Sequence, residues 1–467
     1  MNREYFWASK EARSKDPSRV GMVQLALPIL LEFALHSTVN MMDVAFLSRV
    51  SDSAVNAVSV SGQYIMLFLM ACSTVASGTI VCVNQAIGMK NLRKVNMLAS
   101  IALVVNTLLG ILFGVLFLNG SDVMLKIMSL EPASKAAAGR YMRIAGGLMV
   151  FQAVSFVLNS LCRSMGRTRA PLLINLTVNT INVVGNYLVV FHPELVGNID
   201  PVTGVAIASV LGCFCGLVLS VTIVLRTGLR PSLRLLRPFP MQDFKLALSI
   251  GIPGGISNLA YFLSQIATTA ILSLTGETMM AAKVYVSNVV QYIALVGMAF
   301  SQANTIMVGY RVGAGKFDEA REIRALVTKI ALLSNMMFSL LLILVNQPVM
   351  RLFTDNPVIL QMASRLIMLD FAVEIGRALN NSISGALQAT GDVNYQLVVN
   401  QSSAWIVSVG GSYLLGIVCG LGLYGVWIAF AADELFRGLV LLRRWRSGKW
   451  QPGAEERRKI ISAERGA

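Results

Sequence analysis

The 467-residue chain has little charge and few histidines. Charged residues make up 13% of it, hydrophobic residues make up 55%, and there are 2 histidines. About a quarter of the residues in a soluble domain are charged, so this composition is typical of a membrane protein. Twelve stretches are long and apolar enough to cross a bilayer, which takes roughly 20 residues each. They lie at about 22–47, 54–83, 96–118, 137–160, 171–192, 202–225, 245–274, 280–308, 322–346, 360–388, 396–419 and 422–442.

Common catalytic motifs are also missing. The sequence has no P-loop, no H-E-x-x-H and no G-x-S-x-G, which argues against ATP hydrolysis, a zinc protease and a serine hydrolase. The 6 cysteines all fall in or at the ends of the apolar stretches, without the spacing of a zinc site. We therefore expect neither an enzyme nor a bound cofactor. A membrane-embedded sensor or enzyme would need a cytoplasmic domain or a catalytic constellation, and neither is visible.

The apolar stretches indicate an all-α polytopic membrane protein. Only helices and closed barrels satisfy the backbone in lipid, and these long runs do not alternate as barrel strands do. We therefore predict twelve transmembrane helices. The lipid bilayer is the first expected partner.

The chain repeats itself at a spacing of 225 residues. Pro28 falls on Pro253, and Gly88, Gly166 and Asn175 fall on equivalent glycines and an asparagine in the second half. Duplicated halves are typical of secondary transporters. Six spans in each half give both halves the same orientation. The prediction is two pseudo-symmetric six-helix lobes related as a parallel repeat.

The net charge of +15 follows the positive-inside rule. Basic residues gather on alternate loops, which places both termini in the cytoplasm and the protein in the inner or plasma membrane. This distribution explains the charge better than a nucleic-acid partner does. The predicted parts are a cytoplasmic tail (1–20), an N-lobe (21–225), a cytoplasmic linker (226–243), a C-lobe (244–445) and a second cytoplasmic tail (446–467).

Ionisable and amide side chains inside the first half mark candidate sites, because such groups are costly in lipid. Asp43 lies deep in the first span, and its repeat partner is Thr268. Glu32 lies about three turns earlier, with His36 between them, so these three side chains are candidates for a proton or cation route. The alternatives are an interfacial glutamate paired with a cytoplasmic arginine and a hydrogen-bonded core histidine.

Four asparagines share one face of the fifth span at helical spacing. They are Asn175, Asn179, Asn182 and Asn186. This face can coordinate an ion opposite Asp43, or it can hold helices together by hydrogen bonds.

The tenth span carries the corresponding charges of the second half. Asp370, Glu374 and Arg377 step by four and three residues and so share a face. They predict either a charged cavity lining or a local ion pair. Lys283, near the start of the eighth span, is a partner for these acids or extends to the interface.

In the order and duplication of its motifs, the chain resembles the multidrug and toxic compound extrusion (MATE) family over residues 20–445. The first span contributes ALPILLEF and NMMDVAFLSRV, and the next motifs are QAIGMKN and CRSMGRTRAPLLIN. The second half contributes GYRVGAGKFDEA, GALQATGDVNY and GLYGVWIA.

This resemblance implies export of organic cations or amphipathic compounds, driven by an inward H⁺ or Na⁺ gradient. It implies ion coupling, and possible Na⁺ binding, at Asp43, Asn182, Asn186 and Ser209. Related proteins often carry an aspartate at the position of Asn186, so one carboxylate stands here in place of two. Some also carry a glutamate in the seventh span, where this chain offers Asn258, Tyr261 and Gln265.

The prediction is a monomeric antiporter that works by rocker-switch alternating access, with Pro28 and Pro253 as hinges. The substrate-cavity residues are expected to be Glu32, His36, Asn179, Asn258, Tyr261, Asp370, Glu374 and Arg377. The alternative is a flippase for lipids or lipid-linked precursors with a related fold, which would need a larger and more cationic cavity.

Overall fold

The computed structural model describes residues 20–128 and 130–462, and for residues 38–45 it describes the backbone alone. The all-α prediction is confirmed over the described residues, which contain helices and no strand. Each of the twelve predicted spans corresponds to a helix or a short series of helices. In the first half these are α2 (Met22–Leu47), α3 (Asp52–Gly88), α4 (Leu92–Lys126), α5 (Pro132–Tyr141) with η3 (Met142–Gly146) and α6 (Val150–Ser164), α7 (Arg169–Phe191) and α8 (Pro201–Leu225).

The second half repeats this order. It comprises α9 (Met241–Ser273), α10 (Glu277–Gly313), α11 (Phe317–Leu344), α13 (Pro357–Thr390), α14 (Val393–Ser403) with η6 (Ala404–Gly410) and η7 (Ser412–Val418), and α15 (Gly422–Arg446). Short helices lie in the connections and at the C-terminal end: η4 (Pro193–Val196), η5 (Leu233–Leu236), α12 (Asn346–Met350) and α16 (Gln451–Ser462).

Seven of the described helices are individually long and apolar enough to cross a membrane, and the bent α5–α6 pair makes up to eight. Among the other predicted spans, α13 carries Asp370, Glu374 and Arg377, and α15 carries charged residues of its own. Charge lowers the mean hydropathy of these two helices even though much of it is buried. The α14–η7 span contains two π-helical segments, a form that often marks functional sites.

The chain divides into two compact units. One contains residues 31–251, and the other contains residues 252–467 together with the first 30 residues. Both crossing points fall inside a helix, α2 or α9, within three residues of Pro28 or Pro253. Both helices continue through their prolines.

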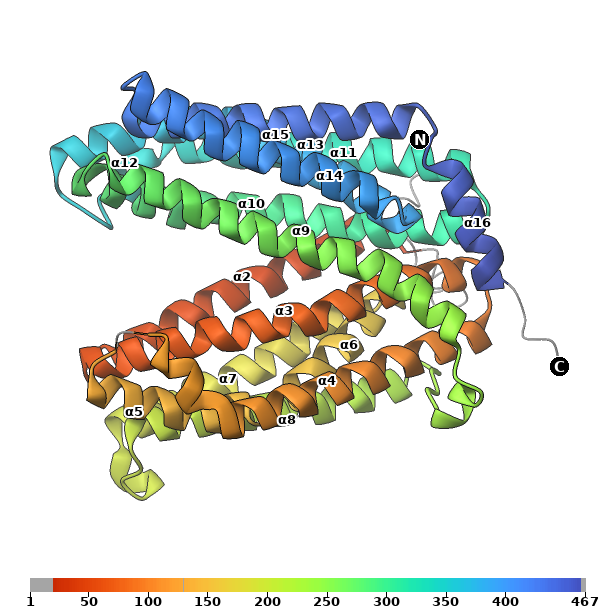
Figure 1. Ribbon diagram of the computed structural model, residues 1–467, viewed down its shortest axis with the longest axis horizontal. Helices are drawn as coiled ribbons and strands as arrows, with labels where there is room; N and C mark the ends of the chain where they lie inside the picture. The colour runs from red at the N-terminus through yellow and green to blue at the C-terminus, as the bar shows by residue number, and fades with distance from the viewer. Residues whose placement is uncertain (1–19, 129, 463–467) are drawn as a thin grey trace. The chain divides into compact units, whose positions relative to one another are not determined.

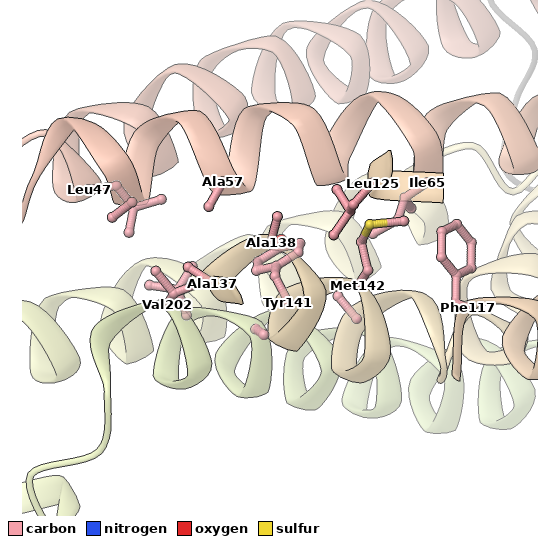
Figure 2. Packing of buried hydrophobic residues seen from close by; sticks show 14 of the residues in the cluster. Leu47, Ala57, Ile65, Phe117, Leu125, Ala137, Ala138, Tyr141, Met142 and Val202 are labelled. Atoms are coloured by element: carbon pink, nitrogen blue, oxygen red, sulfur yellow. The ribbon is translucent and has the colours of Figure 1, made fainter. Parts of the chain in front are cut away.

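The unit containing residues 31–251 has a core of small and medium-sized apolar side chains. Figure 2 shows Phe117, Leu125 and Met142 packed near Ile65 of α3. Small residues bring the helices close together. A Cβ built at Gly114 would lie 2.5 Å from the carbonyl oxygen of Gly147, too close for any larger residue to fit without a shift. Close approach through small residues is how helices associate in lipid, where no hydrophobic force drives them together.

The second unit has its own core, which includes Val286, Leu366 and Trp427 from three different helices. Figure 1 shows α10, α13 and α15 running beside one another in this unit. Hydrogen bonds fix α10 against α13, because Asn304 donates to the Ser382 carbonyl at 2.7 Å. This packing places the charged residues of α13 and α15 inside the unit.

Part of the stretch that was expected to be a polar tail forms the helix α16. Figure 1 shows it turned across the ends of the helices of its unit. Its Arg458 donates to the carbonyl oxygen of Gly313 at 3.0 Å, and Arg457 donates to that of Thr390 at 3.2 Å. These contacts satisfy carbonyls at the C-terminal ends of α10 and α13, which a helix leaves without partners. Trp450 anchors the start of α16 by stacking on Trp445, with 4.5 Å between the ring centroids.

Candidate functional site: a buried carboxylate cluster

The charged residues of α13 form a buried pair. Glu374 has no exposed surface, and its carboxylate forms an ion pair with Arg377 one turn later. Its other oxygen accepts a hydrogen bond from Asn335 of α11 at 2.9 Å. The structure therefore contains the local ion pair that helical spacing allowed, and it adds an amide from a third helix.

A second charged group, on α15, faces the first. Arg437 forms ion pairs with Asp433 and, at 3.1 Å, with Glu434. Ser403 donates to Asp433 at 2.5 Å, and Asn380 donates to Glu434 at 2.8 Å. All three charged side chains are buried, at 3–6% exposure.

Contacts between α13 and α15 join the two groups. Arg377 lies 3.8 Å from the Glu434 carboxylate. Asp370, one turn before Glu374, accepts a hydrogen bond from Trp427 of α15 at 3.1 Å. The Arg437 guanidinium lies over the ring of Tyr261 of α9, 5.7 Å from the ring centroid. We call Asp370, Glu374, Arg377, Asp433, Glu434 and Arg437 the carboxylate cluster.

The carboxylate cluster has an imbalance of charge. It holds four carboxylates and two guanidiniums, which gives a formal charge of −2 when all six are ionised. An unpaired charge costs several kcal/mol in a low-dielectric interior, so such a group is neutralised by a proton or a cation. The arrangement can therefore take up and release positive charge.

Sequence reasoning found only the α13 part of this cluster. Asp433, Glu434 and Arg437 lie inside the apolar stretch 422–442, where the same rule on intramembrane charges applies. The signal was present in the sequence as ADELFR. Only the structure pairs it with α13, because residues more than 50 positions apart are brought together by packing.

In the first half, the structure brings together three of the predicted ion-coupling residues. Asn182 donates to Ser209 of α8 at 2.9 Å, and Asn186 donates to Asn182 at 3.2 Å. Asn182 and Asn186 are both buried. The Asn179 side-chain nitrogen is buried and has no partner among the described residues. Asp43 lies in α2, but its side chain is outside those that the structure describes.

Glu32 lies in a separate contact nearer the start of α2. It pairs with Arg163 of α6 at 2.8 Å and accepts a hydrogen bond from Asn175 of α7 at 2.8 Å. This contact ties three helices of the first half together. His36, one turn later, is exposed.

The remaining predicted residues lie on α2 and α9. Asn258 is exposed on α9, and Pro28 and Pro253 are buried in their helices. The described residues contain no group of three or more histidine, cysteine, aspartate or glutamate side chains arranged to hold a metal ion. Any Na⁺ site in the first half would therefore depend on Asp43 and on amide and hydroxyl oxygens.

Comparisons with known proteins identify the family. The MatE family profile matches residues 28–188 and 253–414. The chain is 31% identical over 436 residues to the uncharacterized transporter YisQ of Bacillus subtilis, covering 92% of this chain and 94% of that protein. It is 26% identical over 453 residues to a probable multidrug resistance protein NorM of Thermotoga maritima, covering 96% of this chain and 95% of that one.

A solved structure shows the same fold at low sequence identity. The outward-facing structure of a multidrug resistance MATE family transporter of the MOP superfamily matches with a TM-score of 0.80 at 17% identity. That match covers 98% of this chain and 99% of the other. The two MatE matches begin at Pro28 and Pro253, which fits the internal repeat. The chain is an integral membrane protein and belongs to the MatE family, the multidrug and toxic compound extrusion transporters.

Proposed function

We propose that this protein is a secondary antiporter that exports small cationic or amphipathic organic compounds in exchange for H⁺ or Na⁺. Transport proceeds by rocker-switch alternating access between the two six-helix lobes, with both termini in the cytoplasm. The relatives named for multidrug resistance support the substrate class. The observation that carries the coupling proposal is the excess of two carboxylates in the buried cluster.

The carboxylate cluster favours protons as the coupling ion of the second half. A proton binds a single carboxylate oxygen and needs no coordination shell. A Na⁺ ion would need several oxygen ligands, and here Arg377 and Arg437 already occupy carboxylate oxygens and would repel it. In the first half, Asn182, Asn186 and Ser209 instead offer neutral oxygens for the Na⁺ site that the sequence predicts together with Asp43.

The proposed cycle uses the cluster as a store of positive charge. In one state the acid excess is neutralised by protons, and in the other the protons leave towards the cytoplasm. Contacts between α13 and α15 change with this charge, because Arg377 and Arg437 compete for Glu434. A change at this contact alters the packing of the lobe and links proton movement to its motion.

Transport assays in liposomes test the proposal. The purified protein is reconstituted with a fluorescent organic cation such as ethidium, and a pH gradient or a Na⁺ gradient is imposed separately. We expect the pH gradient to drive dye movement, and Glu374→Gln or Asp433→Asn to slow it by roughly tenfold or more. The matched control is Glu456→Gln on α16, which removes an exposed carboxylate outside the cluster.

Three outcomes separate the possible sites. Loss of coupling in Asp43→Asn, but not in the cluster variants, would assign coupling to the first half. Movement driven only by Na⁺ would contradict proton coupling through the cluster. No response to either gradient in the unmodified protein would reject the antiporter. Lipid flipping, the alternative from sequence, is less well supported, because the cluster is acidic and not cationic.

A further inference from the structure

A lysine on α10 lies outside the carboxylate cluster and pairs with no carboxylate that the structure describes. Lys283 is half-buried, and its ammonium donates to the Thr269 hydroxyl of α9 at 2.5 Å. The Thr269 hydroxyl in turn donates to the carbonyl oxygen of Gln265 at 2.8 Å, which fixes its orientation. No described carboxylate pairs with Lys283. An ammonium has three donors, so two remain for a ligand or water.

The same threonine lines a concavity on α9. The concavity has a volume of about 470 Å³ and is lined by Phe262, Gln265, Ile266, Thr269, Ala270 and Ser273. These residues recur at steps of three and four, so they form one helix face. Phe262 and Ile266 are each about half exposed. The face is therefore apolar, with an amide, two hydroxyls and a nearby ammonium.

The hydrogen bond distinguishes Lys283 from a lysine that extends to the membrane interface. A snorkelling lysine directs its ammonium into water along its apolar stem. Lys283 instead directs its ammonium across to α9, onto a residue of the concavity. The repeat also places Thr268, the neighbour of Thr269, at the position of Asp43. At the position where the first half carries an acid, the second half carries a neutral hydroxyl, next to the threonine that Lys283 contacts.

We infer that this concavity binds the oxyanion head of an amphipathic organic anion or zwitterion, with Lys283 as the counter-ion. The apolar body lies along Phe262 and Ile266, and the carboxylate, sulfonate or phosphate pairs with the two remaining Lys283 donors. The occupant is a small amphiphile, because a concavity of about 470 Å³ has the size of a small-molecule site. The inference concerns binding alone, so it does not depend on ion coupling.

A matched pair of fluorescent probes tests the site. The protein is placed in phosphatidylcholine nanodiscs and titrated with 8-anilinonaphthalene-1-sulfonate or with N-phenyl-1-naphthylamine, which is the same body without the sulfonate. We expect saturable sulfonate binding that weakens roughly tenfold in Lys283→Met, because a hydrogen-bonded charge pair is lost. Lys283→Arg should retain sulfonate binding. The affinity for the neutral probe should be the same in both variants as in the unmodified protein.

Two further variants serve as controls. Lys245→Met removes an exposed lysine of α9, 24 residues before Thr269 in the sequence, and should leave the binding of both probes unchanged. Ala270→Trp fills the concavity and should weaken both probes. Neutral-probe binding that persists in Lys283→Met also shows that this variant is folded.

The lipid arm identifies the source of the oxyanion. Phosphatidylglycerol is added to the nanodiscs, and sulfonate binding is measured again. The absence of competition supports the small amphiphile, and competition that disappears in Lys283→Met would overturn it in favour of a lipid headgroup. The inference is wrong if Lys283→Met leaves sulfonate binding unchanged, or if it weakens both probes equally. These equilibrium results stand even if no gradient drives transport.

Discussion

Buried ionic side chains control the energetics of this protein at the scale of single residues. Arg377 is close to Glu374 and Glu434, and both carboxylates are almost fully buried. Removing one partner of such a group leaves a buried charge without compensation, which costs about 3–5 kcal/mol. The arginine is therefore important for folding as well as for any change of state.

Replacing Arg377 should destabilise the protein. We expect Arg377→Gln to lower stability by about 3 kcal/mol or more, because the acid excess of the cluster rises from two to three. Arg377→Lys keeps the charge but loses the planar fork, so its effect should be intermediate. Thermal unfolding in detergent measures both. An unchanged midpoint in Arg377→Gln would show that the cluster is already neutralised without this arginine.

At the scale of helices, small residues set how closely the elements approach. A Cβ built at Gly385 of α13 would lie 2.4 Å from the Ser301 carbonyl oxygen of α10. The hydrogen bond from Thr305 to the Gly385 carbonyl, at 3.0 Å, lies at the same crossing. The α10–α13 contact, and with it the position of the α13 acids, therefore depends on this glycine.

Gly385→Ala should separate these helices. We expect a loss of about 1–3 kcal/mol from overpacking, seen as a lower unfolding midpoint together with slower gradient-driven transport. Gly254→Ala on α9 is the matched control, since a Cβ there has nothing within 4 Å. That change should be neutral or should stabilise the helix by up to about 1 kcal/mol. Equal midpoints for the two variants would contradict the close approach.

At the scale of the whole molecule, the internal repeat and the basic loops predict the topology. An even number of spans with basic alternate loops predicts cytoplasmic termini. Duplication gives each half a first helix with a buried proline, yet the two halves differ in chemistry. The first half has an asparagine face and one predicted acid, while the second has the carboxylate cluster.

Reporter fusions measure this topology. We expect green fluorescent protein after Ala467 to fluoresce, as it does only in the cytoplasm, and alkaline phosphatase fused after Asn198 to be active, as it is only outside. Asn198 lies between α7 and α8, on the side opposite to the basic loops. The reverse pattern would overturn the orientation drawn from the positive-inside rule.

The sequence predicted the elements better than it predicted their partners. Long apolar stretches identified all twelve spans, and helical spacing correctly grouped Glu374 with Arg377. The sequence could not place Glu434 beside Arg377, because these two residues are far apart in the chain and only packing brings them together. The α16 helix was not predicted, since its short polar stretch is stabilised mainly by docking through Trp450 and Arg458.

The sequence alone determined the membrane setting, the all-α class, the duplication and the family, because these depend on composition, periodicity and motif order. Tertiary structure decided which charges meet: Glu32 with Arg163, and Arg377 of α13 with Glu434 of α15. The physical reason is that the cost of a charge in lipid is a local property of the residue. Its compensation depends on which other helix supplies the opposite charge, and only packing determines that.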